Sequence, residues 1–85
     1  MRAKTNVNGR KSIGKYLAKL RIDYEETLEQ MATSIGISKG TLSNIELGKC
    51  AIKSELAKEI VRVYELDDRE QAEFYLTIIE SEVEQ

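Results

Sequence analysis

Residues 28–47 read LEQMATSIGISKGTLSNIEL, a stretch whose apolar, turn and capping residues predict two short helices joined by a tight turn. Four apolar residues recur at the spacing of one helical face: Leu28, Met31, Ala32 and Ile35. Thr27 precedes them as a favourable N-cap. Gly36 follows them and is expected to end the helix, because glycine adopts the left-handed conformation without steric cost.

A second helix is expected from about Lys39 to Leu47, with Ser38 as its N-cap. Leu42 and Ile45 would form its inward face. The leading end and the other face would carry the following side chains and glycine: Lys39, Gly40, Thr41, Ser43 and Asn44.

Five residues in one register satisfy the separate requirements of a helix-turn-helix: Ala32, Gly36, Ser38, Leu42 and Ile45. Ala32 lies where the two helices would cross, and a larger side chain there would hold them apart. Gly48 is expected to cap the second helix at its C-terminal end. The alternative is an ordinary helical hairpin in a small bundle, a geometry that many unrelated helical proteins share.

The chain has 85 residues, the size of one domain, and its 41% hydrophobic content with no proline predicts a soluble, all-α protein. No apolar run approaches the roughly 18 residues of a membrane span, so we expect no membrane partner and a cytoplasmic location. The lone Cys50 fits a reducing compartment, with a redox-active thiol as the alternative. Because the chain has no histidine and one cysteine, we expect no metal, no cofactor and no enzymatic activity.

The net charge of −2 is distributed unevenly along the chain. Residues 1–21 carry seven basic side chains and no acidic one, whereas residues 50–85 carry four basic and ten acidic side chains. A basic start can face phosphate while the acidic end faces away. The alternative is a solvated charge run at a disordered terminus.

The other segments complete a helical domain. Residues 1–11 lack periodicity and are expected to form a flexible basic arm. Ser12 would cap a first helix that ends near Tyr24, and Ser54 would begin a fourth helix. The main domain is thus expected to span residues 12–66, with Leu66 closing its core.

Residues 67–85 are expected to contain a fifth helix over about 68–83. Asp67 with Glu70, or Asp68 with Gln71, would form its capping box. Its apolar face is wider than packing on four helices requires, so it either covers the bundle or forms a dimer. The residues considered for such a dimer are Phe74, Tyr75, Ile78 and Ile79.

The stretch from Ile13 to Leu66 resembles the lambda-repressor-like helix-turn-helix domains of bacteria and their phages, also called the Cro, phage-repressor or XRE family. Leu20-Arg21 resembles the family's "LR", Met31-Ala32 its "LA" and Gly36-Ile37-Ser38 its "GVS" turn. Residues 41–49, TLSNIELGK, resemble "TISRIERGK". The resemblance implies a five-helix fold with the helix-turn-helix at helices 2 and 3.

The resemblance also implies roles for individual residues. Arg21 would pair with Glu46, and loss of one partner could cost about 3–5 kcal/mol. Bases would be contacted from the second motif helix by Lys39, Gly40, Thr41, Ser43 and Asn44. Lys39 suits guanine and Asn44 suits adenine, each discriminating by roughly 1–3 kcal/mol. The expected phosphate contacts are Arg2, Lys4, Arg10, Lys11, Lys15, Lys19, Arg21, Thr27, Lys49 and Lys53.

Three features depart from the family pattern. The first position of helix 2 is Leu28 where the family often has a phosphate-binding glutamine, and Lys53-Ser54 replaces the usual Pro-Ser. Glu25, Glu26 and Glu29 favour the dipole of helix 2 but oppose the approach of DNA on that side.

The sequence therefore predicts a sequence-specific, double-stranded-DNA-binding transcriptional regulator, a repressor of a phage, mobile-element or toxin–antitoxin operon. A homodimer, formed through helix 5 or through the loop after helix 3, would bind a pseudo-palindrome with half-sites about 34 Å apart. The alternative is a protein-interaction module, an antitoxin or anti-repressor, that binds a protein partner through helix 5.

Overall fold

The structure, a computed structural model, describes residues 12–83, and all regular secondary structure within that range is helical. The predicted starts of the third and fourth helices are confirmed, and the fifth helix covers the predicted range; Ser12, predicted to cap the first helix, lies within it. The first helix ends one residue before Tyr24, and the second motif helix one residue before Leu47. The five helices are α1 (Ser12–Asp23), α2 (Leu28–Ile35), α3 (Lys39–Glu46), α4 (Ser54–Val63) and α5 (Asp68–Val83).

Short-range hydrogen bonds fix both ends of α2, as the sequence predicts. The Gln30 N–H donates to Thr27 Oγ1 at 3.1 Å, and the Thr27 N–H donates to Gln30 Oε1 at 2.8 Å. Gly36 has a φ of 80°, and the next residue, Ile37, donates its N–H to the Ala32 carbonyl at 3.0 Å. The chain therefore reverses tightly after Ile35 and enters α3 at once.

The ends of the other helices follow the same chemistry. Ser38 Oγ accepts the Thr41 N–H at 3.1 Å and caps α3. Gly48 has a φ of 82° and donates its N–H to the Ile45 carbonyl at 3.0 Å, so it closes α3 as predicted. Of the two capping boxes considered for α5, the one that forms joins Asp67 and Glu70.

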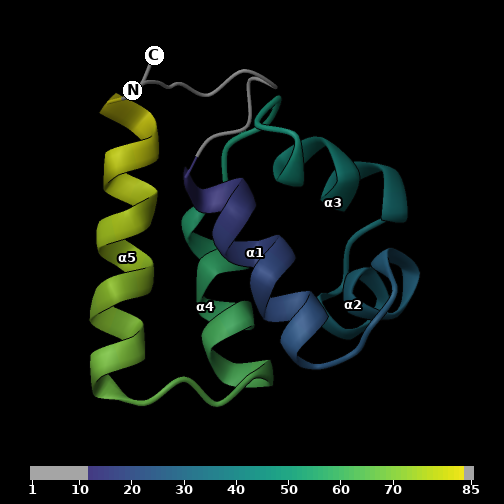
Figure 1. The fold of residues 1–85 in the computed structure, drawn as a ribbon, viewed down its shortest axis with the longest axis horizontal. Coiled ribbons are helices and arrows are strands. Elements are labelled where there is room, and N and C mark those ends of the chain that lie inside the picture. Colours follow the sequence, from purple (N-terminus) through teal and green to yellow (C-terminus); the bar gives the residue numbers. More distant parts are fainter. Residues whose placement is uncertain (1–11, 84–85) are drawn as a thin grey trace.

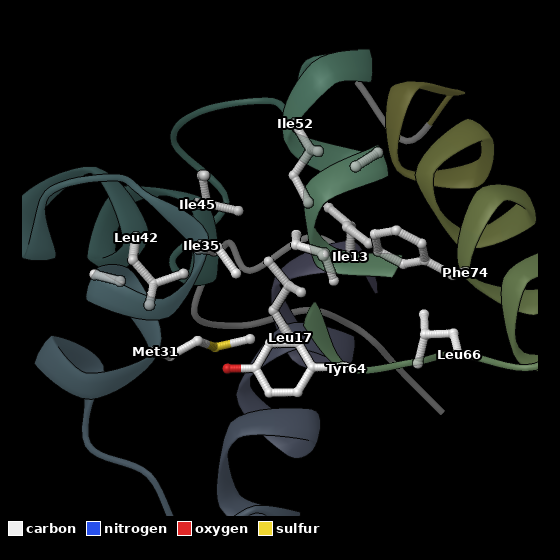
Figure 2. Packing of buried hydrophobic residues seen from close by; sticks show 13 residues of the cluster. Ile13, Leu17, Met31, Ile35, Leu42, Ile45, Ile52, Tyr64, Leu66 and Phe74 are labelled. Carbon is white, nitrogen blue, oxygen red and sulfur yellow. The ribbon is translucent and has the colours of Figure 1, made fainter. Parts of the chain in front are cut away.

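One hydrophobic core joins all five helices (Figure 2). Of the residues predicted to face inward from α2 and α3, all are buried in it except Leu28, which is half-buried against it because it lies in the first turn of α2, and Leu66 is buried as well. Figure 1 shows α5 on one side of the molecule and α2 and α3 on the other, with α1 and α4 between them. The buried cluster consists of Ile13, Leu17, Met31, Ala32, Ile35, Leu42, Ile45, Ile52, Ala57, Ile60, Tyr64, Leu66 and Phe74.

The structure corrects the surface considered for a dimer on α5. Phe74 is fully buried and its ring stacks on that of Tyr16, with ring centres 5.4 Å apart, so it supplies no outer surface. Ile78 is half-buried against the core. The pattern was misleading because hydrophobic residues occupy two faces of α5, and only one of them packs on α1 and the core. The exposed large apolar side chains of α5 are Tyr75, Leu76 and Ile79.

Two contacts that fix α1 are absent from the sequence-based predictions. The buried Ser81 on α5 accepts the Ile13 N–H at 2.7 Å and so satisfies an amide in the first turn of α1. Gly14 lies against the end of α3, where a Cβ would be 2.5 Å from the Glu46 carbonyl oxygen. Helix α1 is thus held by α5 on one side and approaches the backbone of α3 on the other.

Candidate nucleic-acid interface

The leading end and outer face of α3 present the residues predicted to contact bases. Lys39, Gly40, Thr41 and Asn44 are exposed, and Ser43 is half-buried. The opposite face of α3 packs into the core through Leu42 and Ile45. This division arises because residues three apart, such as 42 and 45, share a helical face. The structure therefore brings all five predicted residues together on one short helix.

A pair of hydroxyl groups lies at the leading end of α3. In addition to accepting the Thr41 N–H, Ser38 donates its hydroxyl proton to Thr41 Oγ1 at 2.8 Å. Both residues are exposed. The spacing of a serine and a threonine three residues apart at a helix start could have indicated this contact, because the N-cap and N3 side chains lie close together.

The predicted pair between Arg21 and Glu46 is present and bidentate. Arg21 Nε donates to Glu46 Oε2 at 2.9 Å, and Nη2 donates to Oε1 at 3.2 Å. The Arg21 side chain is 20% exposed and that of Glu46 is 8% exposed. The hydrogen bonds to Glu46 raise the pKa of Arg21 above its ordinary value. Arg21 Nη1 also donates to the Glu26 carbonyl at 3.1 Å, so this side chain joins α1, the start of α2 and the end of α3.

A shallow hollow lies between the start of α2 and the start of α3. Its lining includes Arg21, Thr27, Glu29 and Lys39. The first-turn amides of α2 have no acceptor within the helix, and the positive end of the helix dipole favours an anion beside them. Thr27 Oγ1 is engaged as the N-cap acceptor of α2. The cationic side chains that line this hollow are those of Arg21 and Lys39.

The three glutamates near the start of α2 have different environments. Glu26 is half-buried, and its carboxylate accepts the Tyr64 hydroxyl at 2.5 Å from the end of α4. Glu25 and Glu29 are exposed. One of the three charges that would oppose DNA is therefore directed toward the protein, and the other two remain at the surface.

The remaining cations predicted to contact phosphate come from different segments of the chain. Lys49 and Lys53 are exposed in the connection between α3 and α4, and Lys15 and Lys19 are exposed on α1. Lys19 pairs with Asp23 at 3.1 Å, an exposed pair of little energetic weight. The predicted contacts of the N-terminal arm, Arg2, Lys4, Arg10 and Lys11, lie outside the described residues.

No group of three or more His, Cys, Asp or Glu side chains is arranged to hold a metal ion in the part of the chain that the structure describes. Between residues 12 and 83, the helices are all too short or too polar to cross a membrane.

Residues 12–74 match the model of a family described as the helix-turn-helix domain. The chain belongs to this helix-turn-helix family. The family is related to the XRE and Cro-like domains, in agreement with the resemblance seen in the sequence. Searches of curated proteins and of solved structures found no match.

In this helix-turn-helix domain, α2 and α3 form the motif, and the match extends into α5 as far as Phe74. The domain is of a DNA-binding type. Helix α3 has the position of the recognition helix, whose N-terminal residues approach base edges in such motifs.

Proposed function

We propose that the protein is a sequence-specific transcriptional regulator that inserts α3 into the major groove of double-stranded DNA. The observation that carries this proposal is the exposed leading end of α3, which has no carboxylate before Glu46. Glu46 is itself neutralised by Arg21. The exposed surface of α3 therefore carries hydrogen-bond donors, which suit a polyanion such as DNA. The only acidic side chain of this helix, Glu46, is buried.

Two side chains on α3 are suited to particular bases. Lys39 can donate to O6 and N7 of guanine, and the Asn44 amide can form two hydrogen bonds with adenine. Phosphate contacts by Arg21, Lys49 and Lys53 would set the register of the domain on the duplex. The first-turn amides of α2 would add a phosphate contact through the helix dipole.

The regulation proposed is repression of a phage, mobile-element or toxin–antitoxin operon. A small domain bound across a promoter prevents other proteins from occupying the same DNA, so occupancy is sufficient for repression. The proposal requires that the protein and its DNA share a compartment, which is the cytoplasm in a bacterium. It requires no metal, cofactor or catalytic group.

We further propose that the protein binds as a homodimer to a pseudo-palindromic site. Tyr75, Leu76 and Ile79 expose apolar surface on α5, and burial of such surface favours association. Half-sites would then lie one helical turn of DNA apart, about 34 Å, or a multiple of it.

Replacement of Leu76 by glutamate should shift sedimentation equilibrium toward the monomer, and Lys58→Glu on α4 is the exposed control. Unchanged association of the Leu76 variant would exclude this interface.

Selection from a pool of randomised duplexes tests the proposed function. The wild-type protein should enrich one sequence motif. Asn44→Ala should relax selection at one position of that motif by about 5- to 150-fold, which corresponds to roughly 1–3 kcal/mol. Lys58→Ala, which removes an exposed charge from α4, should leave the motif unchanged.

The exposed apolar side chains of α5, Tyr75, Leu76 and Ile79, also favour a second function, that of a protein-interaction module such as an antitoxin or anti-repressor. This function predicts no enriched motif and little affinity for any duplex at low salt. Enrichment of a motif that depends on Asn44 would exclude it as the main activity.

A further inference from the structure

The hydroxyl groups of Ser38 and Thr41 are linked in a defined order at the start of α3. The Thr41 N–H donates to Ser38 Oγ at 3.1 Å, and Ser38 donates to Thr41 Oγ1 at 2.8 Å. A hydroxyl oxygen that accepts one hydrogen bond becomes a better donor of its own proton, because successive hydrogen bonds polarise each other. The backbone of α3 therefore favours donation from Ser38 to Thr41.

This order leaves the Thr41 proton available to a partner outside the protein. A threonine hydroxyl has one proton and two lone pairs, and one lone pair is occupied by Ser38. Elsewhere in the described chain, Ser34 and Thr77 donate to the carbonyl four residues earlier, at 3.0 and 2.7 Å. Thr41 makes no such bond within that part of the chain, because the residue four positions earlier, Ile37, precedes the helix.

We propose that Thr41 is a specificity-determining residue that contacts DNA as a hydrogen-bond donor, and that Ser38 is the positioning residue that sets this polarity. The inference rests on the proposed function. In the major groove, guanine offers O6 and N7, adenine offers N7 and thymine offers O4 as acceptors, whereas cytosine offers the N4 donor. The base that faces Thr41 is therefore a guanine, adenine or thymine, and cytosine is excluded there.

Substitutions at both residues separate polarity from simple contact. Ser38→Asp keeps a favourable N-cap but supplies only acceptors, so the Thr41 proton turns toward the carboxylate and a lone pair faces the DNA. Ser38→Gly keeps most of the capping energy and removes the hydroxyl without adding charge. Thr41→Val removes the hydroxyl of Thr41 at nearly constant shape. Far-UV circular dichroism of each variant verifies that the helices are retained.

The experiment measures relative affinity for all four bases at every position of the duplex selected by the wild-type protein. We expect one position at which cytosine is disfavoured by about 5- to 150-fold. Thr41→Val should remove that discrimination, and Ser38→Gly should weaken it. Ser38→Asp should lower affinity for all sequences through its charge, and at that position it should remove the discrimination against cytosine and favour cytosine or adenine, whose N4 and N6 amino groups are donors. In the Thr41→Val background, Ser38→Asp should not alter base preference.

Three outcomes would overturn part of the account. If Thr41→Val leaves every preference intact while Asn44→Ala relaxes one, the role of Thr41 is wrong and the proposed function stands. If Thr41→Val removes the discrimination against cytosine but Ser38→Asp leaves cytosine disfavoured at that position, the positioning role of Ser38 is wrong. If the wild-type protein selects no sequence, the proposed function itself fails.

Discussion

Arg21 connects three segments that are distant in the sequence. Its guanidinium donates twice to Glu46 at the end of α3 and once to the Glu26 carbonyl before α2. The resemblance to repressors predicted the pair with Glu46, but no local pattern relates positions 21 and 46. The contact with the Glu26 backbone was not predicted, because it depends on where the turn after α1 passes.

Replacement of Glu46 by alanine should lower the free energy of unfolding by about 2–4 kcal/mol, because it leaves the half-buried Arg21 without its carboxylate. This range lies below the one expected from the sequence, since water reaches a fifth of the Arg21 side chain. Urea denaturation measures the effect. Glu59→Ala, which breaks the exposed pair with Arg62, is the control and should produce no measurable change.

The environment of Tyr64 predicts that the free energy of unfolding decreases at alkaline pH. Burial and the hydrogen bond to Glu26 raise the pKa of Tyr64 well above its ordinary value of 10.0. Between the unfolded and the folded pKa, the folded state retains a proton that the unfolded state has released. The contribution of Tyr64 is therefore complete below pH 10 and decreases by up to about 1.4 kcal/mol per pH unit above it.

The stability advantage of the wild type over Tyr64→Phe should accordingly shrink between pH 8 and pH 11, as measured by urea denaturation at each pH. Comparison of two variants cancels the titration of lysines that both share. The exposed Tyr75 provides the control substitution, Tyr75→Phe, whose difference from the wild type should stay constant. A constant difference for Tyr64→Phe would contradict the raised pKa that burial and the hydrogen bond to Glu26 give Tyr64.

At the scale of elements, Gly14 sets how closely α1 approaches α3. A Cβ at this position would be 2.5 Å from the Glu46 carbonyl oxygen and 2.9 Å from that of Ile45. Gly14→Ala should therefore force the helices apart and lower the free energy of unfolding by about 1–3 kcal/mol. Gly40→Ala is the matched control: a Cβ there meets no atom nearer than 4.0 Å, and alanine favours a helix by up to about 1 kcal/mol. Thermal unfolding should thus shift in opposite directions for the two variants.

Ser81 makes α5 part of the support of α1. Ser81→Ala would leave the buried Ile13 N–H without an acceptor and should cost about 1–3 kcal/mol. Thr77→Ala removes an exposed hydroxyl bond to a carbonyl within α5 and should be nearly neutral. Equal stability of the two variants in urea would show that the amide of Ile13 finds another partner.

The order and ends of the helices could be predicted because their causes are local. Thr27 determines the start of α2, and Gly36 and Ser38 determine the turn between α2 and α3, through hydrogen bonds that span at most five residues. The roles of Gly14 and Ser81 were not predicted because their partners are distant in the sequence. Gly14 lies against the carbonyl oxygen of Glu46, 32 positions away, and Ser81 accepts the N–H of Ile13, 68 positions away. Their roles depend on the tertiary arrangement rather than on a pattern.

The outer surface was harder to predict than the core. The repeat of apolar residues on α5 could not distinguish Phe74, which is buried, from Tyr75 and Ile79, which are exposed. The five residues expected to contact bases lie at the start of one helix or away from its buried face, so the exposure of four of them could be predicted, whereas Ser43 is half-buried. The cations expected to contact phosphate come from several elements, and sequence alone could not place them relative to one another.

For the whole molecule, the charge pattern matches the arrangement of the helices. Figure 1 shows α5 on the side of the molecule away from α2 and α3. The sequence of α5 contains several acidic residues. A duplex that approaches α3 therefore meets the leading end of that helix and avoids most of the acidic residues of α5. This polarity explains how a chain with a net charge of −2 is compatible with a polyanionic partner.

An NMR titration of the labelled protein with a mixed-sequence duplex at two salt concentrations tests the central claim that α3 faces DNA. Backbone amide shifts should centre on Lys39 to Asn44 and the start of α2, and they should diminish as salt rises, because phosphate contacts release counterions. If these amides do not shift at low salt while the spectrum remains that of the folded protein, the assignment of α3 as a DNA-binding helix is contradicted.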